Sequence, residues 1–471
     1  MALPKADEII SPKIVRRGFD EGVYNWARFA LMPTPASREG TVLRPVDQPP
    51  QSSTSEPPGM NAVLFLLTLS VLINYIDRSN LSIAAPLIKD ELGLSAWQLG
   101  KLLSVFFWTY ALMQIPAGWL VDRFDVKWVF AAGLLVWSLA TTVTGILHGF
   151  AALVVVRLIL GLGESVAFPS YSKILRVHFR ESRRGFANAM IMTGLALGPA
   201  LGMLVGGTAV ARFGWRPFFI ALGIAGLLWL APWWGLMPRR TIRFEPASSG
   251  GSGYLPILKQ RSAWGTCIGQ GCINYYLYFL VTWLPFYLVR ERHLSMDTMA
   301  KEGALVFLMS AISSTVTGKL SDRWIMAGSS PTLVRKGAMV VGHVGIGIFL
   351  MLTAITHGVV FIVALALTGT FLGIAICNSW AIPQTLAGHC MVGRWVGVQN
   401  LVGNLAGAVA PALTGFLLGR TGSFYWPFVI TAVVAWLGAI AWWFVVGPLD
   451  EVNWEKLASK VLPVTAPATP E

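Results

Sequence analysis

Four ionisable residues stand inside otherwise apolar stretches of the sequence: Asp77, Arg78, Arg157 and Glu164. A charge at the centre of a membrane helix costs on the order of several kcal/mol, so such residues must be paired, protonated or in contact with water. The planar guanidinium of Arg78 can hold a carboxylate through two hydrogen bonds. A carboxyl group gains a proton more easily when it is buried and less easily beside an arginine. These residue types therefore indicate a site that binds an organic anion and exchanges protons.

The spacing of these residues brings them together in pairs. Asn74, Asp77 and Arg78 fall at i, i+3 and i+4, so a helix places them on one face, directed into a cavity. Arg157 and Glu164 lie two helical turns apart. We predict that Asp77 and Glu164 carry the coupled protons and that Arg78 is the carboxylate clamp. The alternative is a set of structural ion pairs, with Arg157 as the structural partner of Glu164.

Further polar side chains within the apolar stretches could orient the hydroxyl groups of a polyhydroxylated acid. They are Tyr75, Tyr110, Asn274, Tyr275, Tyr278, Ser379, Asn400 and Asn404. An interhelical hydrogen bond is the alternative for Asn404. The helix core or an interfacial aromatic belt is the alternative for the tyrosines.

The composition requires membrane helices to position these residues. Only 13% of the 471 residues are charged and 55% are hydrophobic, whereas soluble proteins carry about 25% charged residues. Apolar stretches of about 20 residues, long enough to cross a bilayer, recur along the chain. They span 62–86, 97–121, 128–147, 151–176, 185–209, 217–237, 262–289, 300–320, 335–356, 358–380, 391–418 and 423–446. We therefore predict an all-α membrane protein with twelve transmembrane helices.

The sequence repeats itself across a polar connection. Gly118, Asp122 and Arg123 follow the second span as Gly318, Asp322 and Arg323 follow the eighth, about 200 residues later. This repeat predicts two similar six-helix bundles. The expected parts are a disordered cytoplasmic tail (1–60), an N-terminal bundle (61–237), a cytoplasmic linker (238–261), a C-terminal bundle (262–447) and a second cytoplasmic tail (448–471).

Basic residues give the orientation and limit the partners. They gather in alternate short loops, as at Arg123, Arg183 and Arg323, which places these loops and both termini in the cytoplasm. The net charge of +13 is spread over these loops rather than over one patch, which argues against nucleic acid as a partner. The 4 cysteines form neither a disulfide framework nor a zinc motif.

Several strings resemble the major facilitator superfamily. Its loop signature stands here as Gly118, Asp122, Arg123 and Lys127, with Asp125 where the family usually has glycine. The narrower resemblance is to the anion:cation symporter family, which includes bacterial galactonate, glucarate and hexuronate transporters. The strings that carry it are Asn74-Tyr-Ile-Asp-Arg78, Met113-Gln-Ile-Pro-Ala-Gly-Trp-Leu-Val-Asp122, Arg157-Leu-Ile-Leu-Gly-Leu-Gly-Glu164, Thr282-Trp-Leu-Pro285 and Val398-Gln-Asn-Leu-Val-Gly-Asn404-Leu-Ala-Gly407.

The resemblance implies a major facilitator fold in the inner (plasma) membrane and proton-coupled symport of a small organic anion such as a sugar acid. It implies that Asp77 and Glu164 bind the protons and that Arg78 and Arg157 help to bind the substrate. Asp122, Arg123, Asp322 and Arg323 would form the cytoplasmic gate. The expected partners are the anion, protons and the lipid bilayer, with the chain acting as a monomer.

Other functions remain as alternatives. The same fold could serve an organic-anion exchanger, facilitator or exporter. A membrane sensor that does not transport would be expected to carry a longer folded tail than this sequence has. No nucleophile with its base, metal-ligand cluster or phosphate-binding loop is recognisable, so we expect neither an enzyme nor a cofactor or metal site.

Overall fold

The computed structural model describes residues 59–179, 181–238 and 254–454, and these ranges contain helices but no strand. The first half of the chain forms α2 (Met60–Glu91), α3 (Ala96–Arg123), α4 (Val126–Thr144), α5 (Phe150–Ser165), α6 (Ala167–His178), α7 (Glu181–Leu201), α8 (Gly207–Phe213) and α9 (Trp215–Leu236). The second half forms α10 (Leu255–Leu258), α11 (Arg261–Arg290), α12 (Met296–Met326), α13 (Pro331–Ile355), α14 (Gly358–Ile376), α15 (Ala381–Thr421) and α16 (Tyr425–Ile440). Two π-helical segments, Gly202–Gly206 and Ala441–Val445, join α7 to α8 and extend α16.

Within the described ranges, 11 helical segments are long and apolar enough to cross a membrane. The 28-residue helix α3 lies outside this set, although it is long enough, and adding it to the eleven gives twelve. The predicted all-α membrane fold is therefore confirmed. The boundaries shift by a few residues, and the largest shift is in the tenth span, which continues to Gly388. The φ of 59° and ψ of −170° at Gly388 kink the chain before the span that starts at Met391. Glycine adopts this left-handed conformation without a Cβ clash.

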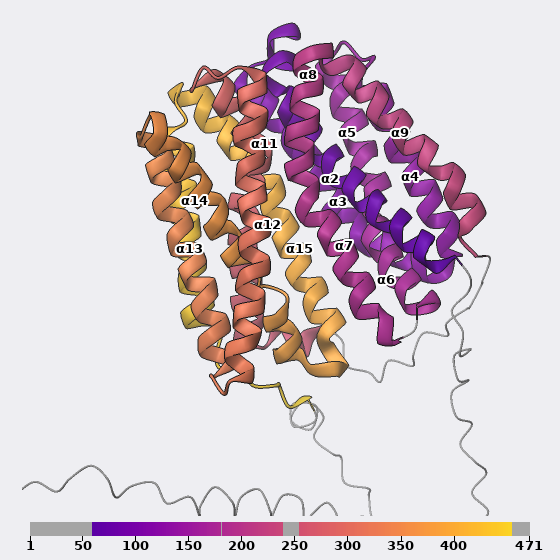
Figure 1. The fold of residues 1–471 in the computed structure, drawn as a ribbon, viewed down its shortest axis with the longest axis vertical. Coiled ribbons are helices and arrows are strands. Elements are labelled where there is room, and N and C mark those ends of the chain that lie inside the picture. Colours follow the sequence, from indigo (N-terminus) through magenta and orange to yellow (C-terminus); the bar gives the residue numbers. More distant parts are fainter. Residues whose placement is uncertain (1–58, 180, 239–253, 455–471) are drawn as a thin grey trace, which may run out of the picture. The chain divides into compact units, whose positions relative to one another are not determined.

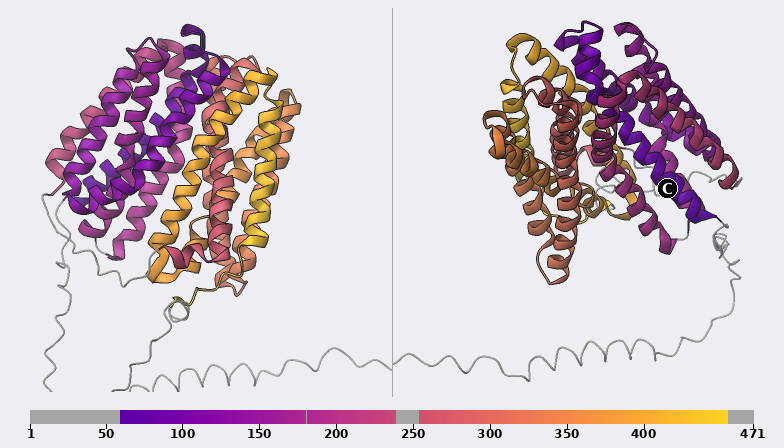
Figure 2. Two further views of the ribbon diagram at one scale, coloured as in Figure 1. Left: turned by 180° about the vertical axis from the view of Figure 1, so that it is seen from behind. Right: turned by 45° about the horizontal axis from the view of Figure 1, so that its top comes forward.

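The helices form two bundles of six spans each, in which α5 with α6 makes one span and α7 with α8 makes another. Figure 1 shows α2 to α9 grouped together and α11 to α16 grouped beside them, and the view from behind in Figure 2 shows the same division. Helix α3 packs against α15, and α12 packs against α7 and α8. Small residues allow the first contact, since a Cβ added at Gly100 would lie 2.9 Å from Cα of Gly415.

A matching lysine contact marks the internal repeat in three dimensions. Lys127 at the start of α4 donates through Nζ to the carbonyl of Met237, at 2.6 Å. Lys336 in α13 donates in the same way to the carbonyl of Val446, also at 2.6 Å. In both bundles the acceptor follows the lysine by 110 residues at the end of the last helix. The two halves of the sequence therefore build the same local arrangement.

Asp125, where the resembled family usually has glycine, begins α4. Its side-chain oxygen accepts a hydrogen bond from the backbone N–H of Lys127 at 2.9 Å. A capping aspartate satisfies a helix N–H that would otherwise lack a partner. The replacement therefore keeps a turn at this position and adds a helix cap.

The two ends of the helices differ in how the bundles meet. We name them the Asp90 end, at the loop between α2 and α3, and the Arg123 end, at the loop between α3 and α4. Near the Asp90 end, Ser82 of α2 donates to the carbonyl of Val281 of α11 at 2.7 Å. Arg290 of α11 also forms an ion pair there with Asp90. At the Arg123 end, by contrast, nothing lies within 4 Å of a Cβ added at Gly118 or Gly318.

The expected tails at 1–60 and 448–471 and the linker at 238–261 fall mostly outside the described residues. The part of the linker that is described contains the short helix α10. The described start of the final segment packs back on the kink in α15, where the indole of Trp454 donates to the carbonyl of Ala387 at 2.9 Å.

Candidate functional site

An ion pair between Arg78 of α2 and Glu164 of α5 lies at the centre of the candidate site. Arg78 Nε is 3.0 Å from Glu164 Oε2. Arg78 is 8% exposed and Glu164 is 0% exposed, so water screens this pair very little. Neither Nη2 of Arg78 nor Oε1 of Glu164 has a hydrogen-bond partner among the described residues. The pair therefore keeps a free donor and a free acceptor in a buried place.

Three aromatic rings surround the Arg78 guanidinium. Its central carbon lies 4.4 Å from the ring centroid of Tyr110, 4.8 Å from that of Tyr75 and 5.5 Å from that of Phe106. Aromatic faces attract a cation at such distances. Tyr75 and Tyr110, both predicted to orient the substrate, thus contact the predicted clamp. Phe106 was missed in the sequence because a phenylalanine in a membrane span carries no polar signal.

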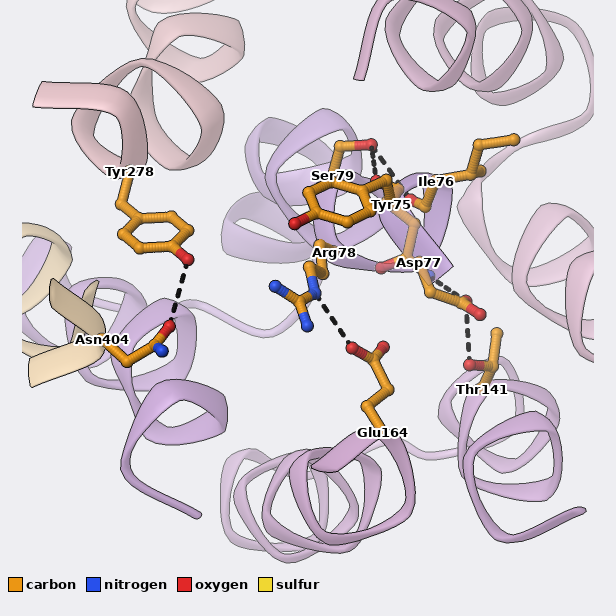
Figure 3. Close-up of polar contacts among 10 residues, drawn as sticks. Tyr75, Ile76, Asp77, Arg78, Ser79, Thr141, Glu164, Tyr278 and Asn404 are labelled. Atoms are coloured by element: carbon orange, nitrogen blue, oxygen red, sulfur yellow. Dashed lines mark hydrogen bonds and ion pairs between the residues drawn. The ribbon is translucent and has the colours of Figure 1, made fainter. Parts of the chain in front are cut away.

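Asp77 belongs to a second group of contacts, which does not include the aromatic rings. Its Oδ1 accepts from Thr141 Oγ1 of α4 at 2.9 Å and from Asn80 Nδ2 at 3.0 Å. Asn80 Oδ1 in turn accepts from Arg157 Nη2 at 3.4 Å. Figure 3 shows Asp77 turned toward Thr141 and Arg78 turned toward Glu164.

This separation departs from the expectation that Asn74, Asp77 and Arg78 point together. Neighbouring residues are about 100° apart around a helix, so Asp77 and Arg78 stand at opposite edges of a broad face with Asn74 between them. Asn74 is 1% exposed and interacts with Glu164, although its amide makes no hydrogen bond of standard geometry.

In the described ranges, no group of three or more histidine, cysteine, aspartate or glutamate side chains could hold a metal ion.

The C-terminal bundle contributes neutral polar groups. Tyr278 of α11 donates to Asn404 Oδ1 of α15 at 3.3 Å, and Asn404 Nδ2 donates to the carbonyl of Asn400 at 2.9 Å. Figure 3 places Tyr278 and Asn404 across from Arg78 and Glu164. In this conformation Asn404 thus makes the interhelical hydrogen bond that was the alternative to substrate binding.

A chain of amides runs beside this pair. Gln270 donates to Asn274 Oδ1 at 2.9 Å, and Gln399 donates to Gln270 Oε1 at 3.2 Å. Gln399 also donates to the backbone carbonyl of Ser379 at 3.1 Å. The two glutamines were missed, although glutamine inside an apolar span is itself a signal. Ser379 lies in the turn between α14 and α15, where its buried hydroxyl donates to the carbonyl of Ile376, and its role toward substrate stays a prediction.

Tyr275 completes the predicted set, and two glycines lie near Asn404. Tyr275 is 7% exposed and takes part in none of these contacts. A Cβ at Gly403 would lie 2.7 Å from Asn274 Nδ2, and one at Gly407 would lie 2.8 Å from the Tyr278 ring. These glycines therefore make room for the polar side chains of α11 rather than for open space.

The predicted gate residues lie at the Arg123 end. Arg123, Asp322 and Arg323 are exposed, and among the described side chains no ion pair involves them. The side chain of Asp122 lies outside the described set. The gate therefore stays a prediction for a conformation in which this end is closed.

Comparisons with known proteins bear on the family and the fold. A family model described as Major Facilitator Superfamily matches residues 67–411. The probable sulfoacetate transporter SauU of Cupriavidus necator is 33% identical, covering 83% of this chain and 94% of its own length. The hexuronate transporter of Bacillus subtilis is 33% identical, over 80% of this chain and 93% of its own length. The probable L-galactonate transporter of Escherichia coli is 29% identical, over 88% of this chain and 95% of its own length.

The structure is similar to that of a bacterial homologue of the human lysosomal transporter Spinster in an inward-facing, occupied conformation. The TM-score is 0.72, with 18% identity, over 83% of this chain and 97% of the other. At this identity the likeness concerns the fold alone.

Proposed function

Because the chain belongs to the major facilitator superfamily, we propose that it carries a small organic anion across the inner membrane together with protons. The proposed substrate is a sugar acid: a hexonate, hexarate or hexuronate. Relatives named for hexuronate and L-galactonate support this class. The amide and tyrosine side chains of α11 and α15 also support it, because a polyhydroxylated acid needs many neutral hydrogen-bonding partners.

The observation that carries the proposal is the buried Arg78–Glu164 pair with its unpartnered Nη2 and Oε1. An arriving carboxylate would bind the guanidinium and compete with Glu164 for it. Glu164, still buried but no longer neutralised, would then take up a proton. Anion and proton would in this way occupy the site together, and neither would cross as an uncompensated charge.

Transport would proceed by alternating access, in which two similar bundles rock around a central site. We assign the Arg123 end and both termini to the cytoplasm, since basic residues gather there. The contacts at the Asp90 end then close the outer side of this conformation. In the opposite conformation Asp122, Arg123, Asp322 and Arg323 would close the cytoplasmic side.

The test is transport by purified protein in proteoliposomes, with D-galactonate, D-glucuronate and galactarate as substrates. Proton symport predicts accumulation of at least one acid when the lumen is more alkaline than the outside. Asp77→Asn is expected to retain exchange of labelled for unlabelled acid and to lose this accumulation.

The same measurement separates the alternatives. Exchange without accumulation in the wild type would indicate an exchanger, and equilibration indifferent to pH would indicate a facilitator. An exporter that exchanges protons for the acid would instead accumulate the acid when the gradient is reversed, with the lumen more acidic than the outside. Failure of all three acids to bind or exchange would contradict the sugar-acid assignment.

A further inference from the structure

Asn80 lies on α2 one turn after Asp77 and connects two charged residues. Its side chain is 0% exposed. Its Nδ2 lies 3.0 Å from Asp77 Oδ1, and its Oδ1 lies 3.4 Å from Arg157 Nη2. A guanidinium has donors but no acceptor, so the amide atom facing Arg157 must be the oxygen. The amide nitrogen must consequently face Asp77, and Arg157 fixes the direction of the whole bridge.

The groups around Asp77 determine how the Asn80 hydrogen bond affects the protonation of its carboxyl. The charged groups acting on Asp77 are Glu164 and Arg157 of α5, and α4 contributes the neutral donor Thr141. The described residues of the other helices packed on α2 contribute no charged group there. Both hydrogen bonds to the carboxyl end at Oδ1. Donors of this kind favour the ionised carboxylate, and Oδ2 is left as the oxygen that can take a proton.

We propose that Asn80 is a positioning residue for proton coupling, which transmits the state of Arg157 to Asp77. While Arg157 donates to the amide oxygen of Asn80, the amide nitrogen must donate to Asp77, and this hydrogen bond favours the ionised form of Asp77. When a bound anion draws Arg157 away, Asn80 is free to turn, Asp77 loses a donor and proton uptake becomes easier. This inference rests on the proposed proton symport and adds a second route by which anion binding promotes protonation.

The test compares Asn80→Ala with Thr141→Val in proteoliposomes, with uptake of D-galactonate and D-glucuronate measured from pH 5.5 to 8.5. Removing the Asn80 donor is expected to move the midpoint of the pH profile to higher pH by about one unit. Thr141→Val removes the other donor to the same oxygen, so its midpoint should move in the same direction.

A second measurement separates the two variants: the difference between the pH midpoint at low substrate and the pH midpoint at saturating substrate. Thr141→Val should keep this change, because its Asn80 bridge is intact, whereas Asn80→Ala should lose at least half of it.

A purely structural role for Asn80 gives a different result. Uptake would then fall by the same factor at every pH, without a shift in midpoint, and this outcome would overturn the inference. Should Asn80→Ala fail to elute as a monodisperse protein, Asn80→Ser provides the same comparison, because a serine hydroxyl can bond within its own helix. A wild-type protein whose uptake ignores both pH and the proton gradient would overturn the symport proposal itself, and the Asn80 inference with it.

Discussion

At the level of single residues, two adjacent positions of α2 contact different groups of side chains. Arg78 points to Glu164 and the aromatic rings, whereas Asp77 points to Thr141 and Asn80. In the proposed mechanism the first group binds the anion and takes up a proton at Glu164, and the second takes up a proton at Asp77. Because Glu164 and Arg157 both act on Asp77, the two groups remain electrostatically connected.

Arg78→Lys tests the clamp. Lysine keeps the charge but presents a point-like ammonium instead of a planar fork, so a carboxylate loses its bidentate partner. A hydrogen bond to a charged group contributes about 1.5–3 kcal/mol, which corresponds to a loss of substrate affinity of about 10- to 100-fold. Binding of D-galactonate and D-glucuronate by the purified protein, measured by calorimetry, checks this expectation.

The matched control is Arg212→Lys, an equally conservative change at an exposed position near the Asp90 end. Its affinity should stay within about twofold of the wild type, as expected for an exposed charge. Equal affinities for Arg78→Lys and the wild type would exclude Arg78 as the carboxylate clamp.

At the level of helices, glycines of α7 and of the π-helical segment that follows it set the position of α2 and so of the site. A Cβ added at Gly198 would collide with the side chain of Tyr75, and one at Gly202 would collide with Ser79. Helices in a membrane associate through such close packing rather than through the hydrophobic effect. The glycines of the fifth span thus allow close packing against α2.

Gly198→Ala is therefore expected to destabilise the protein. The new methyl group meets Cβ of Tyr75, which cannot move without the backbone of α2, and overpacking of this kind costs about 1–3 kcal/mol. The apparent melting temperature of the detergent-purified protein should fall, and sugar-acid affinity should fall with it, because Tyr75 contacts Arg78. Gly235→Ala in α9 is the control, since nothing lies within 4 Å of a Cβ there. Equal melting temperatures for both variants and the wild type would contradict the packing role.

The sequence predicted the helices better than it predicted their contacts. Hydropathy and length are local properties, so twelve spans could be placed before any contact was known. The partner of a polar side chain depends on how neighbouring helices are rotated. For this reason Asp77 was expected to point with Arg78 but contacts Thr141 of α4. The kink at Gly388 was missed because a single glycine in an apolar run gives no sign of its φ angle.

At the level of the whole molecule, packing rather than charge holds the two bundles together at the Asp90 end. The Arg290–Asp90 pair links α11 to α2, but its side chains are 39% and 56% exposed. Exposed pairs contribute about 0–1 kcal/mol. The approach of α3 to α15 through Gly100 and Gly415 is buried and leaves no room for a larger residue. We therefore expect separation of α3 from α15 to be the main barrier to opening this end.

A reversible cross-link between these helices tests whether that opening is part of transport. A Cβ at Gly419 of α15 would lie 3.9 Å from the backbone nitrogen of Trp97 of α3, so cysteines at these two neighbouring positions can be tested for a cross-link. In a background with the 4 natural cysteines replaced by serine, oxidised Trp97→Cys/Gly419→Cys should lose uptake and exchange in proportion to the cross-linked fraction. Dithiothreitol should restore both activities, and neither single variant should respond to oxidant. Full uptake by completely cross-linked protein would mean that α3 and α15 stay together throughout the cycle, which would exclude alternating access by opening at the Asp90 end.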